Sequence, residues 1–317
     1  MPDKGDNMTN ESNLAEVFRQ AIIKVGEVVL GKQEHVEKMF TALLCGGHVL
    51  LDDTPGMGKT TLARAMSAVL GMTMHRVQFT SDLMPSDLTG INVAQNLLQE
   101  GLQFQHGPIF ANMVLADEIN RASPRTQSAL LEAMAERQVT VDGTSHHLPN
   151  PFWVVATQNP VDLSGTFPLP DSQMDRFLFR LNVGYPSKED EIKLLMGVGG
   201  DTDILSPLLS TQDVVRAQKE VSVMGISESL ASYIQRLISA TRQHDGIMTG
   251  ASPRGALALM HAAKARAWLR GAKYPTPEDV QVNFVDATAH RLVTSDLDFQ
   301  VKRQIAEDIL STVAINE

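Results

Sequence analysis

The stretch LLDDTPGMGKTTLARA, residues 50–65, constrains the fold of this chain most. It follows a short apolar run at 48–51 and precedes a segment at 59–70 whose apolar side chains repeat at helical spacing. The loop between them nearly matches G-x-x-x-x-G-K-[ST], in which backbone N–H groups and a helix N-terminus surround phosphate oxygens. This strand, loop and helix order predicts a nucleotide-binding loop (P-loop) in an α/β fold.

The residues of the P-loop are the first candidates for binding. Lys59 offers a point charge to the β and γ phosphates, and the Thr60 hydroxyl suits Mg²⁺. The predicted cofactor-binding residues are Thr54, Pro55, Gly56, Met57, Gly58, Lys59, Thr60 and Thr61. Asp53 occupies the position of the first glycine of the pattern. Because that position precedes the phosphate cradle, an aspartate there need not obstruct the triphosphate, provided that its carboxylate points away from it.

A second motif places two carboxylates at the end of an apolar strand. The run MVLADE ends in Asp117 and Glu118, and the carboxyl ends of parallel strands face the ligand crevice of an open α/β sheet. Asp117 is predicted to hold Mg²⁺, and Glu118 to orient and deprotonate the water that attacks the γ phosphate. The remaining negative charge calls for further cations, for which Arg176 and Arg254 are candidates.

Strand and helix patterns alternate in the first half of the chain. The expected buried parallel strands lie at 48–51, 76–79, 113–116, 152–156 and 177–181. Alternation of this kind predicts a parallel sheet with helices on both faces. After residue 185 only helical patterns follow, so we expect a nucleotide-binding domain at 1–185 and an all-α lid domain at 186–317.

Two segments interrupt the alternation. Residues 138–148 place β-formers on both sides of Asp142-Gly143, a dipeptide that favours a tight hairpin turn. Residues 92–105 carry mixed signals and are expected to form a small helix or hairpin that projects from the body.

Composition limits the function classes. The chain has 317 residues, 43% of them hydrophobic, with one cysteine and a formal net charge of −10. A single cysteine excludes an intrachain disulfide and a cysteine-rich metal site, and the acidic total disfavours a broad nucleic-acid footprint. The polar first residues and the lack of any long apolar run support neither a signal peptide nor a membrane span, so the cytoplasm is the expected location.

A series of longer motifs resembles the MoxR family of AAA+ ATPases, in order and spacing, over roughly residues 18 to 290. The matching stretches are LADEINRASP (115–124), QSALLEAM (127–134), ATQNP (156–160), FPLP (167–170), DRF (175–177) and GASPR (250–254).

The resemblance assigns further roles. By it, Lys59 and Thr60 belong to Walker A and Asp117 and Glu118 to Walker B, while Asn159 is similar to sensor 1, which helps to position the attacking water. Arg176 resembles the arginine finger that reaches a neighbouring subunit's nucleotide. Arg254 resembles sensor 2, which reaches the γ phosphate from the helical lid.

The family also places adenine near a segment like VVLG, which ends here at Gly31 and is followed by Lys32 where relatives commonly carry glutamine. Residues 92–105 resemble the helix-2 insert of this branch, and 138–148 its pre-sensor-1 hairpin. The resemblance implies a hexameric ring that uses ATP and Mg²⁺ to remodel or help mature a client protein. It also implies a von Willebrand factor A domain protein as a partner.

Three alternatives remain open at this point. The chain could be a nucleotide-gated binding scaffold without significant turnover, which a phosphate-release assay would separate. It could be a DNA or RNA motor, against which its acidic total speaks, or a metal-chelatase-type motor subunit that differs mainly in its partner.

Overall fold

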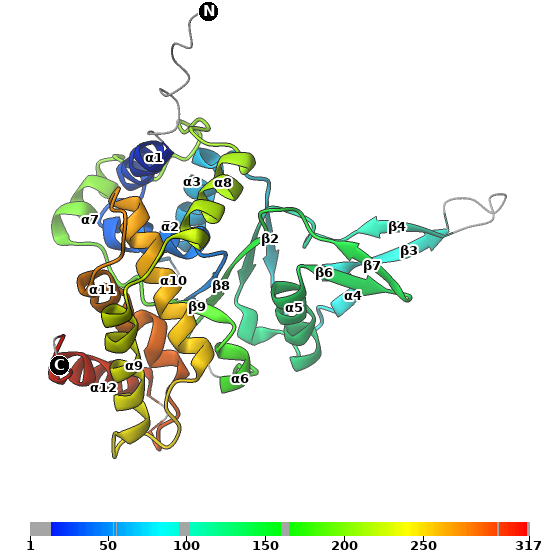
Figure 1. The fold of residues 1–317 in the computed structure, drawn as a ribbon. Helices are drawn as coiled ribbons and strands as arrows, with labels where there is room; N and C mark the ends of the chain where they lie inside the picture. Colours follow the sequence, from blue (N-terminus) through cyan, green and yellow to red (C-terminus); the bar gives the residue numbers. More distant parts are fainter. Residues whose placement is uncertain are drawn as a thin grey trace, which may run out of the picture.

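A five-stranded parallel sheet forms the centre of the computed structural model (Figure 1). The structure describes residues 14–52, 54, 56–94, 102–159, 165–296 and 298–315. The strands of the sheet are β1 (His48–Asp52), β2 (Met74–Gln78), β5 (Met113–Asp117), β8 (Trp153–Gln158) and β9 (Phe177–Leu181). Their spatial order is β2-β5-β8-β1-β9, and every neighbouring pair is parallel.

Alternate side chains of the sheet enter two apolar cores. Val49 and Leu51 of β1 belong to the core that contains α1 (Leu14–Val28), α2 (Gln33–Leu44) and α3 (Lys59–Val69). Leu50 faces the other way, into the core under α4 (Pro85–Thr89) and α5 (Pro124–Glu136). Both faces of the sheet are therefore covered by helices, which confirms the predicted fold class.

The expectation of a buried strand at 76–79 is wrong for part of that segment. β2 runs from Met74 to Gln78 at the edge of the sheet, so most of its side chains are exposed or half-buried. Val77 is buried, whereas Arg76 and Gln78 are exposed. Both exposed side chains face the carboxylates at the end of β5, as described below.

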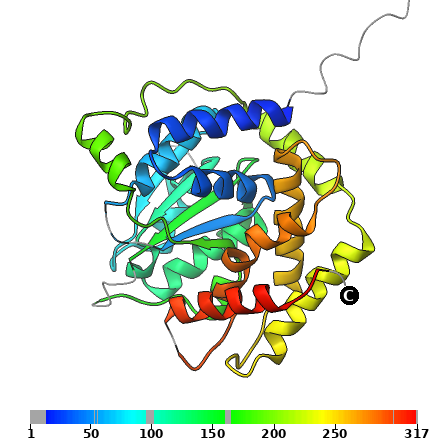
Figure 2. The same cartoon turned by 90° about the vertical axis from the view of Figure 1, so that its left-hand side faces the viewer.

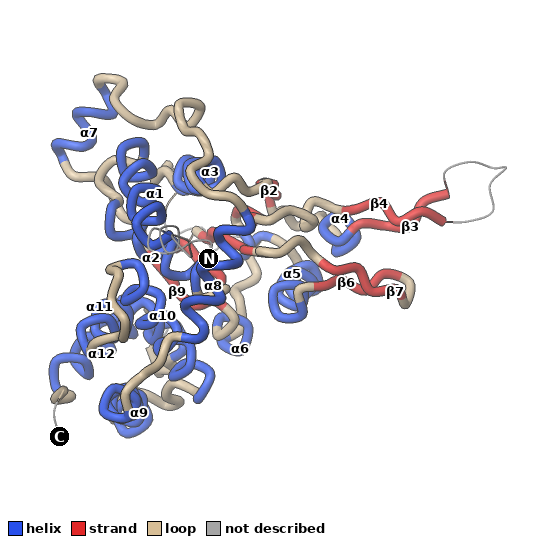
Figure 3. The backbone as a smooth tube through the Cα atoms, turned by 45° about the horizontal axis from the view of Figure 1, so that its top comes forward, coloured by secondary structure: helices blue, strands red, loops and turns tan. Residues whose placement is uncertain are grey.

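Two hairpins project from the sheet, as Figures 1 and 3 show. β6 (Gln138–Val141) and β7 (Thr144–His147) form the predicted 138–148 hairpin, with Asp142 at φ 49° and Gly143 at φ 80° in its turn. β3 (Gly90–Ala94) pairs with β4 (Leu102–His106), which makes a hairpin of the second insertion; residues 95–101 lie outside the described residues.

The two hairpins contact each other. Asn92 Nδ2 donates to Asp142 Oδ2 at 2.7 Å, and the rings of Phe104 and His146 stack with centroids 3.8 Å apart.

Helices dominate the rest of the chain (Figure 3). They are η1 (Ile119–Arg121), α6 (Asp171–Met174), α7 (Lys188–Leu195), α8 (Thr211–Val223), α9 (Glu228–Gln243), α10 (Pro253–Leu269), α11 (Pro277–Thr288), η2 (Ala289–Arg291) and α12 (Phe299–Thr312). Beyond β9, the described residues form no further strand; they form one isolated β-bridge, between Thr249 and Val293. None of the described helices is both long and apolar enough to cross a membrane.

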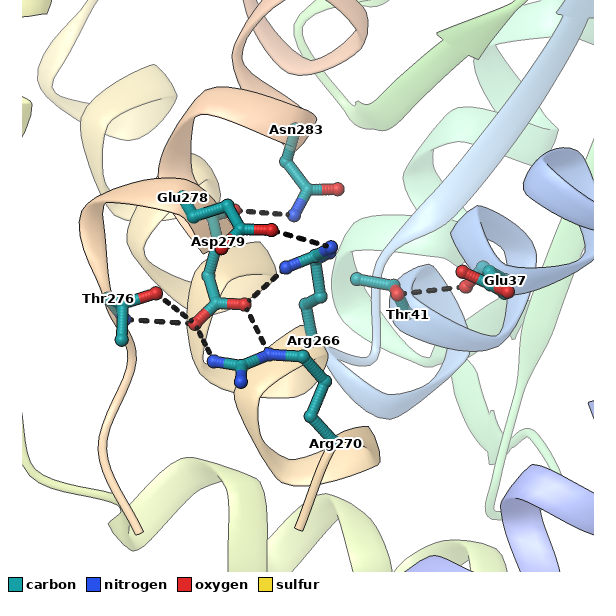
Figure 4. A network of polar contacts seen from close by, with 8 residues as sticks. All are labelled: Glu37, Thr41, Arg266, Arg270, Thr276, Glu278, Asp279 and Asn283. Carbon is teal, nitrogen blue, oxygen red and sulfur yellow. Dashed lines mark hydrogen bonds and ion pairs between the residues drawn. The ribbon is translucent and has the colours of Figure 1, made fainter. Parts of the chain in front are cut away.

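A buried carboxylate joins the helices α10 and α11 of this second part (Figure 4). Asp279, in the first turn of α11, accepts hydrogen bonds from Arg266 (2.6 Å) and Arg270 (2.6 and 3.0 Å) of α10 and from the Thr276 backbone N–H (2.9 Å). Burial alone would raise the pKa of Asp279, but these donors outweigh burial and lower it. The same apolar core runs from α1–α3 into α8–α12, so the division at residues 185 and 186 stays a prediction.

Candidate functional site

The P-loop forms an open cradle at the carboxyl end of β1. Gly56 and Gly58 have φ of 88° and 80°, a left-handed backbone that glycine adopts readily, and a Cβ added to either would meet no atom within 4 Å. Gly58 is also the N-cap of α3, with no capping side-chain hydrogen bond. The first N–H groups of α3 are therefore directed at the cradle without competition from a cap.

The cradle opens into a cavity of about 390 Å³. Its lining residues are Gly56, Gly58, Lys59, Thr60, Thr61, Arg76, Gln78, Asp117, Glu118 and Asn159. The residues present fit a nucleoside triphosphate, because glycines, a helix N-terminus and Lys59 meet in one concave site. They also fit Mg²⁺, because Thr60 and Asp117 contribute the oxygen ligands that this ion prefers.

Asp117 has two partners that pattern reasoning did not find. Thr157 of β8 donates its hydroxyl to Asp117 Oδ1 at 2.6 Å, and Arg76 of β2 donates to Oδ2 at 2.7 and 3.1 Å. The Asp117 side chain is 15% exposed and that of Arg76 is 48% exposed. Arg76 thus neutralises the carboxylate expected to bind Mg²⁺ and is free enough of packing to move aside.

Glu118 is held in a left-handed backbone conformation, with φ 56°. Its backbone N–H donates to the Thr157 hydroxyl (2.9 Å), and its Oε2 accepts from Gln78 Nε2 (2.9 Å) and lies 3.1 Å from Arg121 Nε. Two donors on one carboxylate oxygen fix the direction in which the side chain points. Glu118 is therefore positioned by β2, β8 and η1 together.

Asn159 follows the end of β8, beside the strand that carries Asp117, as predicted. It lines the cavity with both carboxylates. The signal for Arg76 and Gln78 was their spacing of two residues, which places both on one side of a strand. That signal becomes useful only once β2 is known to pair with β5, where Gln78 lies opposite Asp117.

A buried ion pair lies at the end of β1, directly before the P-loop. Asp52, the last residue of β1, accepts a hydrogen bond from Arg180 Nε of β9 at 2.8 Å and one from Gln158 Nε2 at 3.2 Å. The Arg180 guanidinium also lies 3.5 Å from the centre of the Phe299 ring, at the start of α12. Burial lowers the pKa of Arg180, and Asp52 opposes that shift. The start of the P-loop is thereby connected to the last helix.

Arg176 and Arg254 lie together in a different cavity, of about 370 Å³. Its described lining also includes Gly47, His48 and Leu178, from the amino ends of β1 and β9, and shares no residue with the described lining of the P-loop cavity. Arg176 donates to the Leu131 carbonyl at 3.1 Å. Arg254, with 67% of its side chain exposed, lies 3.5 Å from Asp175, which also accepts from the buried Arg291 at 2.7 Å.

The two cavities therefore lie at opposite ends of the sheet. Arg176 immediately precedes β9, whose first residue pairs with His48, whereas the P-loop follows Asp52. At about 3.3 Å per residue, β1 alone separates the two levels by roughly 13 Å. An arginine side chain cannot cover that distance and the loop beyond it. The predicted reach of Arg254 to a γ phosphate is therefore not met within one chain.

Some predicted binding residues do not line the cavity, and one lies outside the described residues. Thr54 and Met57 belong to the P-loop but do not line the cavity, while Pro55 and Asp53 are outside the described residues. Gly31 joins α1 to α2 at φ 71°, and a Cβ there would come 2.6 Å from Asp190 Oδ2. Its role toward adenine stays a prediction.

Comparison with known proteins agrees with this geometry and defines the class of protein. Residues 48–179 match the family model described as "ATPase family associated with various cellular activities (AAA)", and residues 239–312 match that of the AAA lid domain. The P-loop cavity and the helical second part are thus those of an AAA ATPase.

Relatives that align with this chain over most of their own length show to which family of AAA ATPases it belongs. The chain is 39% identical to Chaperone MoxR1 of Mycobacterium tuberculosis, over 96% of this chain and 82% of the relative. It is 43% identical to the uncharacterised protein YeaC of Bacillus subtilis, over 90% of each. The crystal structure of a candidate ATPase from Cytophaga hutchinsonii superposes with a TM-score of 0.85 at 36% identity, over 96% of both chains. The chain belongs to the MoxR family of AAA+ ATPases.

Proposed function

We propose that this protein hydrolyses ATP with Mg²⁺ where two copies meet in a ring of six. One observation carries the proposal: the phosphate cradle with its two carboxylates and the Arg176–Arg254 pair lie at opposite ends of the same sheet. Each chain therefore holds two unlike half-sites. A ring joins the cradle of one copy to the arginines of the next, around all of its junctions.

The cradle end carries the chemistry of bond cleavage. Lys59 and the N-terminus of α3 bind the phosphates, and Asn159 and Glu118 orient a water molecule. Glu118 takes a proton from that water as its oxygen attacks the γ phosphorus, which releases phosphate and leaves ADP. Thr60 and Asp117 would hold Mg²⁺, which would neutralise charge on the phosphate oxygens when bound.

The arginine end supplies positive charge to the neighbour's triphosphate. Arg176 belongs to the proposed nucleotide-binding domain (1–185) and Arg254 to the proposed lid domain (186–317). A planar guanidinium suits phosphate oxygens, and its charge acts most strongly where negative charge develops in the transition state. Both side chains are exposed, so both can meet a neighbouring molecule.

We further propose that the cycle remodels or helps to mature a client protein, with a von Willebrand factor A domain protein as partner. Support comes from the family: a relative 39% identical to this chain is named a chaperone. The net charge of −10 favours a protein client over nucleic acid.

Mixing two inactive variants tests the shared site. Arg176→Ala should bind ATP without hydrolysing it, and Glu118→Gln should trap bound ATP. When the two are mixed, some junctions pair the intact carboxylate of one variant with the intact arginine of the other. Phosphate release should therefore return in the mixture at a substantial fraction of the parent rate, which neither variant shows alone.

The same assay separates the alternatives. A nucleotide-gated scaffold would show no turnover in the parent protein that Glu118→Gln removes. Undiminished turnover by an Arg176→Ala protein proven to be monomeric would refute the shared site. If nucleic acid stimulated turnover at low salt, the motor alternative would take precedence. Proteins retained by Glu118→Gln in ATP would identify the client.

A further inference from the structure

The helix α7 exposes the densest group of apolar side chains in the described residues. No residue of α7 is buried. Eight of the nineteen large apolar side chains that are exposed in the described residues lie between residues 185 and 208. They are Tyr185, Ile192, Leu194, Leu195, Met196, Val198, Ile204 and Leu208, and we call them the α7 surface. Exposed apolar groups gathered in this way mark an interaction site.

The centre of the α7 surface is one face of the helix and the residue that caps it. Ile192, Leu195 and Met196 are spaced i, i+3 and i+4 and are 47%, 83% and 74% exposed. Short helices are marginal in water and gain most of their stability from burying such a face. α7 has eight residues and buries none of them against its own chain.

Hydrogen bonds hold the α7 surface firmly to the nucleotide-binding part. Lys32 Nζ donates to the Val183 and Gly184 carbonyls, at 2.8 and 2.7 Å, just before α7. After α7, the Gly200 N–H donates to the Val28 carbonyl at 2.9 Å, and the Leu208 N–H to the Val69 carbonyl, also at 2.9 Å. Val69 ends α3, the helix that begins at the P-loop, so the exposed face is fixed relative to the cradle.

The far side of the molecule offers a complementary face. In Figure 2, α7 (green) lies to the left of the strands and α10 (golden) to their right. α10 carries Arg254 and, one turn on, Leu257, which is 56% exposed; both line the cavity that contains Arg176. We call this the α10 face.

Charge also matches between the two faces. Residues 185–208 contain five carboxylates and two lysines. The described lining of the cavity of the α10 face contains three arginines, of which Arg291 is buried against Asp175, and a single carboxylate. Faces of opposite sign attract each other and set the orientation of contact.

We propose that the α7 surface docks on the α10 face of the next copy of this chain, beside the shared nucleotide. The proposal rests on the ring of the proposed function, which brings the cradle end of one copy to the arginine end of the next. It adds the surface that holds the two copies together.

Two substitutions in the α7 surface test the docking. Leu195→Asp combined with Met196→Asp should weaken self-association at least about tenfold, measured as molar mass against concentration with ATP and Mg²⁺. Binding of a fluorescent ATP analogue to the monomer should stay within about twofold of the parent, because neither side chain lines the cradle. The matched controls are Val223→Asp and Met248→Asp, whose side chains are 75% and 73% exposed elsewhere; they should assemble like the parent.

The face of contact is tested with a photoreactive benzophenone side chain at position 195 in the purified protein. Adducts should form with a second copy, within residues 171–180 or α10. Adducts elsewhere, or parental assembly in the double variant, would overturn the docking.

These outcomes are independent of hydrolysis, since mass and adducts can be measured in Glu118→Gln. If the docking variants behave as expected while the mixture of Arg176→Ala and Glu118→Gln stays inactive, the docking stands and the proposed function falls. The reverse pattern would leave the shared site and remove the docking.

Discussion

The two ends of the central sheet differ in almost every property that matters for phosphate chemistry. At the carboxyl end, Asp117 and Glu118 are partly buried, and each is held by donors from neighbouring strands. At the amino end, Arg176 and Arg254 are exposed, and within the described residues the one ion pair of Arg254 is a 3.5 Å contact with Asp175. Groups that cleave a bond need fixed positions, whereas groups that complete a neighbour's site need to be reachable. In the proposed ring, this difference gives each copy one fixed end that cleaves the bond and one reachable end that completes the neighbour's site.

The largest expected effect distinguishes the two ends of the sheet by the quantity that a substitution at each end lowers, which is either ATP affinity or turnover. Lys59→Ala should weaken ATP binding on the order of 100-fold, because it removes the only lysine in the described cradle. Arg254→Ala should keep ATP affinity within about twofold and lower turnover on the order of 100-fold. Equilibrium titration and phosphate release measure the two quantities separately.

A matched control is Arg216→Ala, which removes an exposed arginine 3.9 Å from Glu220. It should change neither quantity. Loss of ATP affinity in Arg254→Ala would show that this arginine serves its own chain's nucleotide instead.

A smaller effect concerns the free energy of unfolding at low pH, which depends on a buried histidine at the amino end of the sheet. Burial lowers the pKa of His48, at the start of β1, to about 4, while the Met134 carbonyl opposes that shift. His48 Nδ1 accepts from the Val154 N–H at 3.0 Å, which requires an unprotonated nitrogen. Between about pH 6.5 and 4 only the unfolded chain binds this proton. The free energy of unfolding should therefore be full above pH 6.5 and fall by up to about 3 kcal/mol as the pH drops to 4.

Urea unfolding across this range tests the effect. His48→Gln should flatten part of the slope, because glutamine can still accept from Val154 but does not titrate. His147→Gln, on the exposed strand β7, should leave the slope unchanged. Equal slopes in all three proteins would assign the acid sensitivity to other groups, among them His290, whose pKa burial lowers well below its usual value.

The smallest expected effect tests how tightly the carboxyl end is held. Gln78→Met keeps the length of the side chain and removes the 2.9 Å hydrogen bond to Glu118. Glu118 then loses one of the contacts that fix its position, so turnover should fall by about two- to tenfold. Single-turnover measurements at saturating ATP separate this rate from a change in affinity. An unchanged rate would mean that Glu118 is oriented without Gln78.

Local patterns predicted that Lys59, Thr60, Asp117, Glu118 and Asn159 lie together at the carboxyl end of the sheet. The P-loop, the two carboxylates and Asn159 each follow a strand, and parallel strands bring their carboxyl ends together without any further information. The 138–148 hairpin was equally local, because Asp142-Gly143 specifies its turn. Each of these features depends on a few consecutive residues.

Features that depend on the order of the strands or on the packing of the second part could not be predicted from the sequence. Arg76 contacts Asp117 only because β2 lies beside β5, although a P-loop strand precedes it in the chain. Arg254 lies near Arg176 because α10 covers the amino end of the sheet, and no spacing in the sequence states that. The bare surface of α7 was also unpredicted, since its pattern alone reads as an ordinary helix.

The stacking of Arg180 on Phe299 has a genetic consequence. Asp52 and Phe299 come from distant parts of the chain, yet both contact the same buried guanidinium. A premature stop codon that deleted only α12 would remove the ring from Arg180 and let water reach its ion pair with Asp52, directly before the P-loop. A truncated gene product of this kind should resemble a nucleotide-binding mutant more than a protein with a shortened tail. The C-terminal helix therefore supports the strand end from which the P-loop starts, although none of its described residues lines the phosphate cavity.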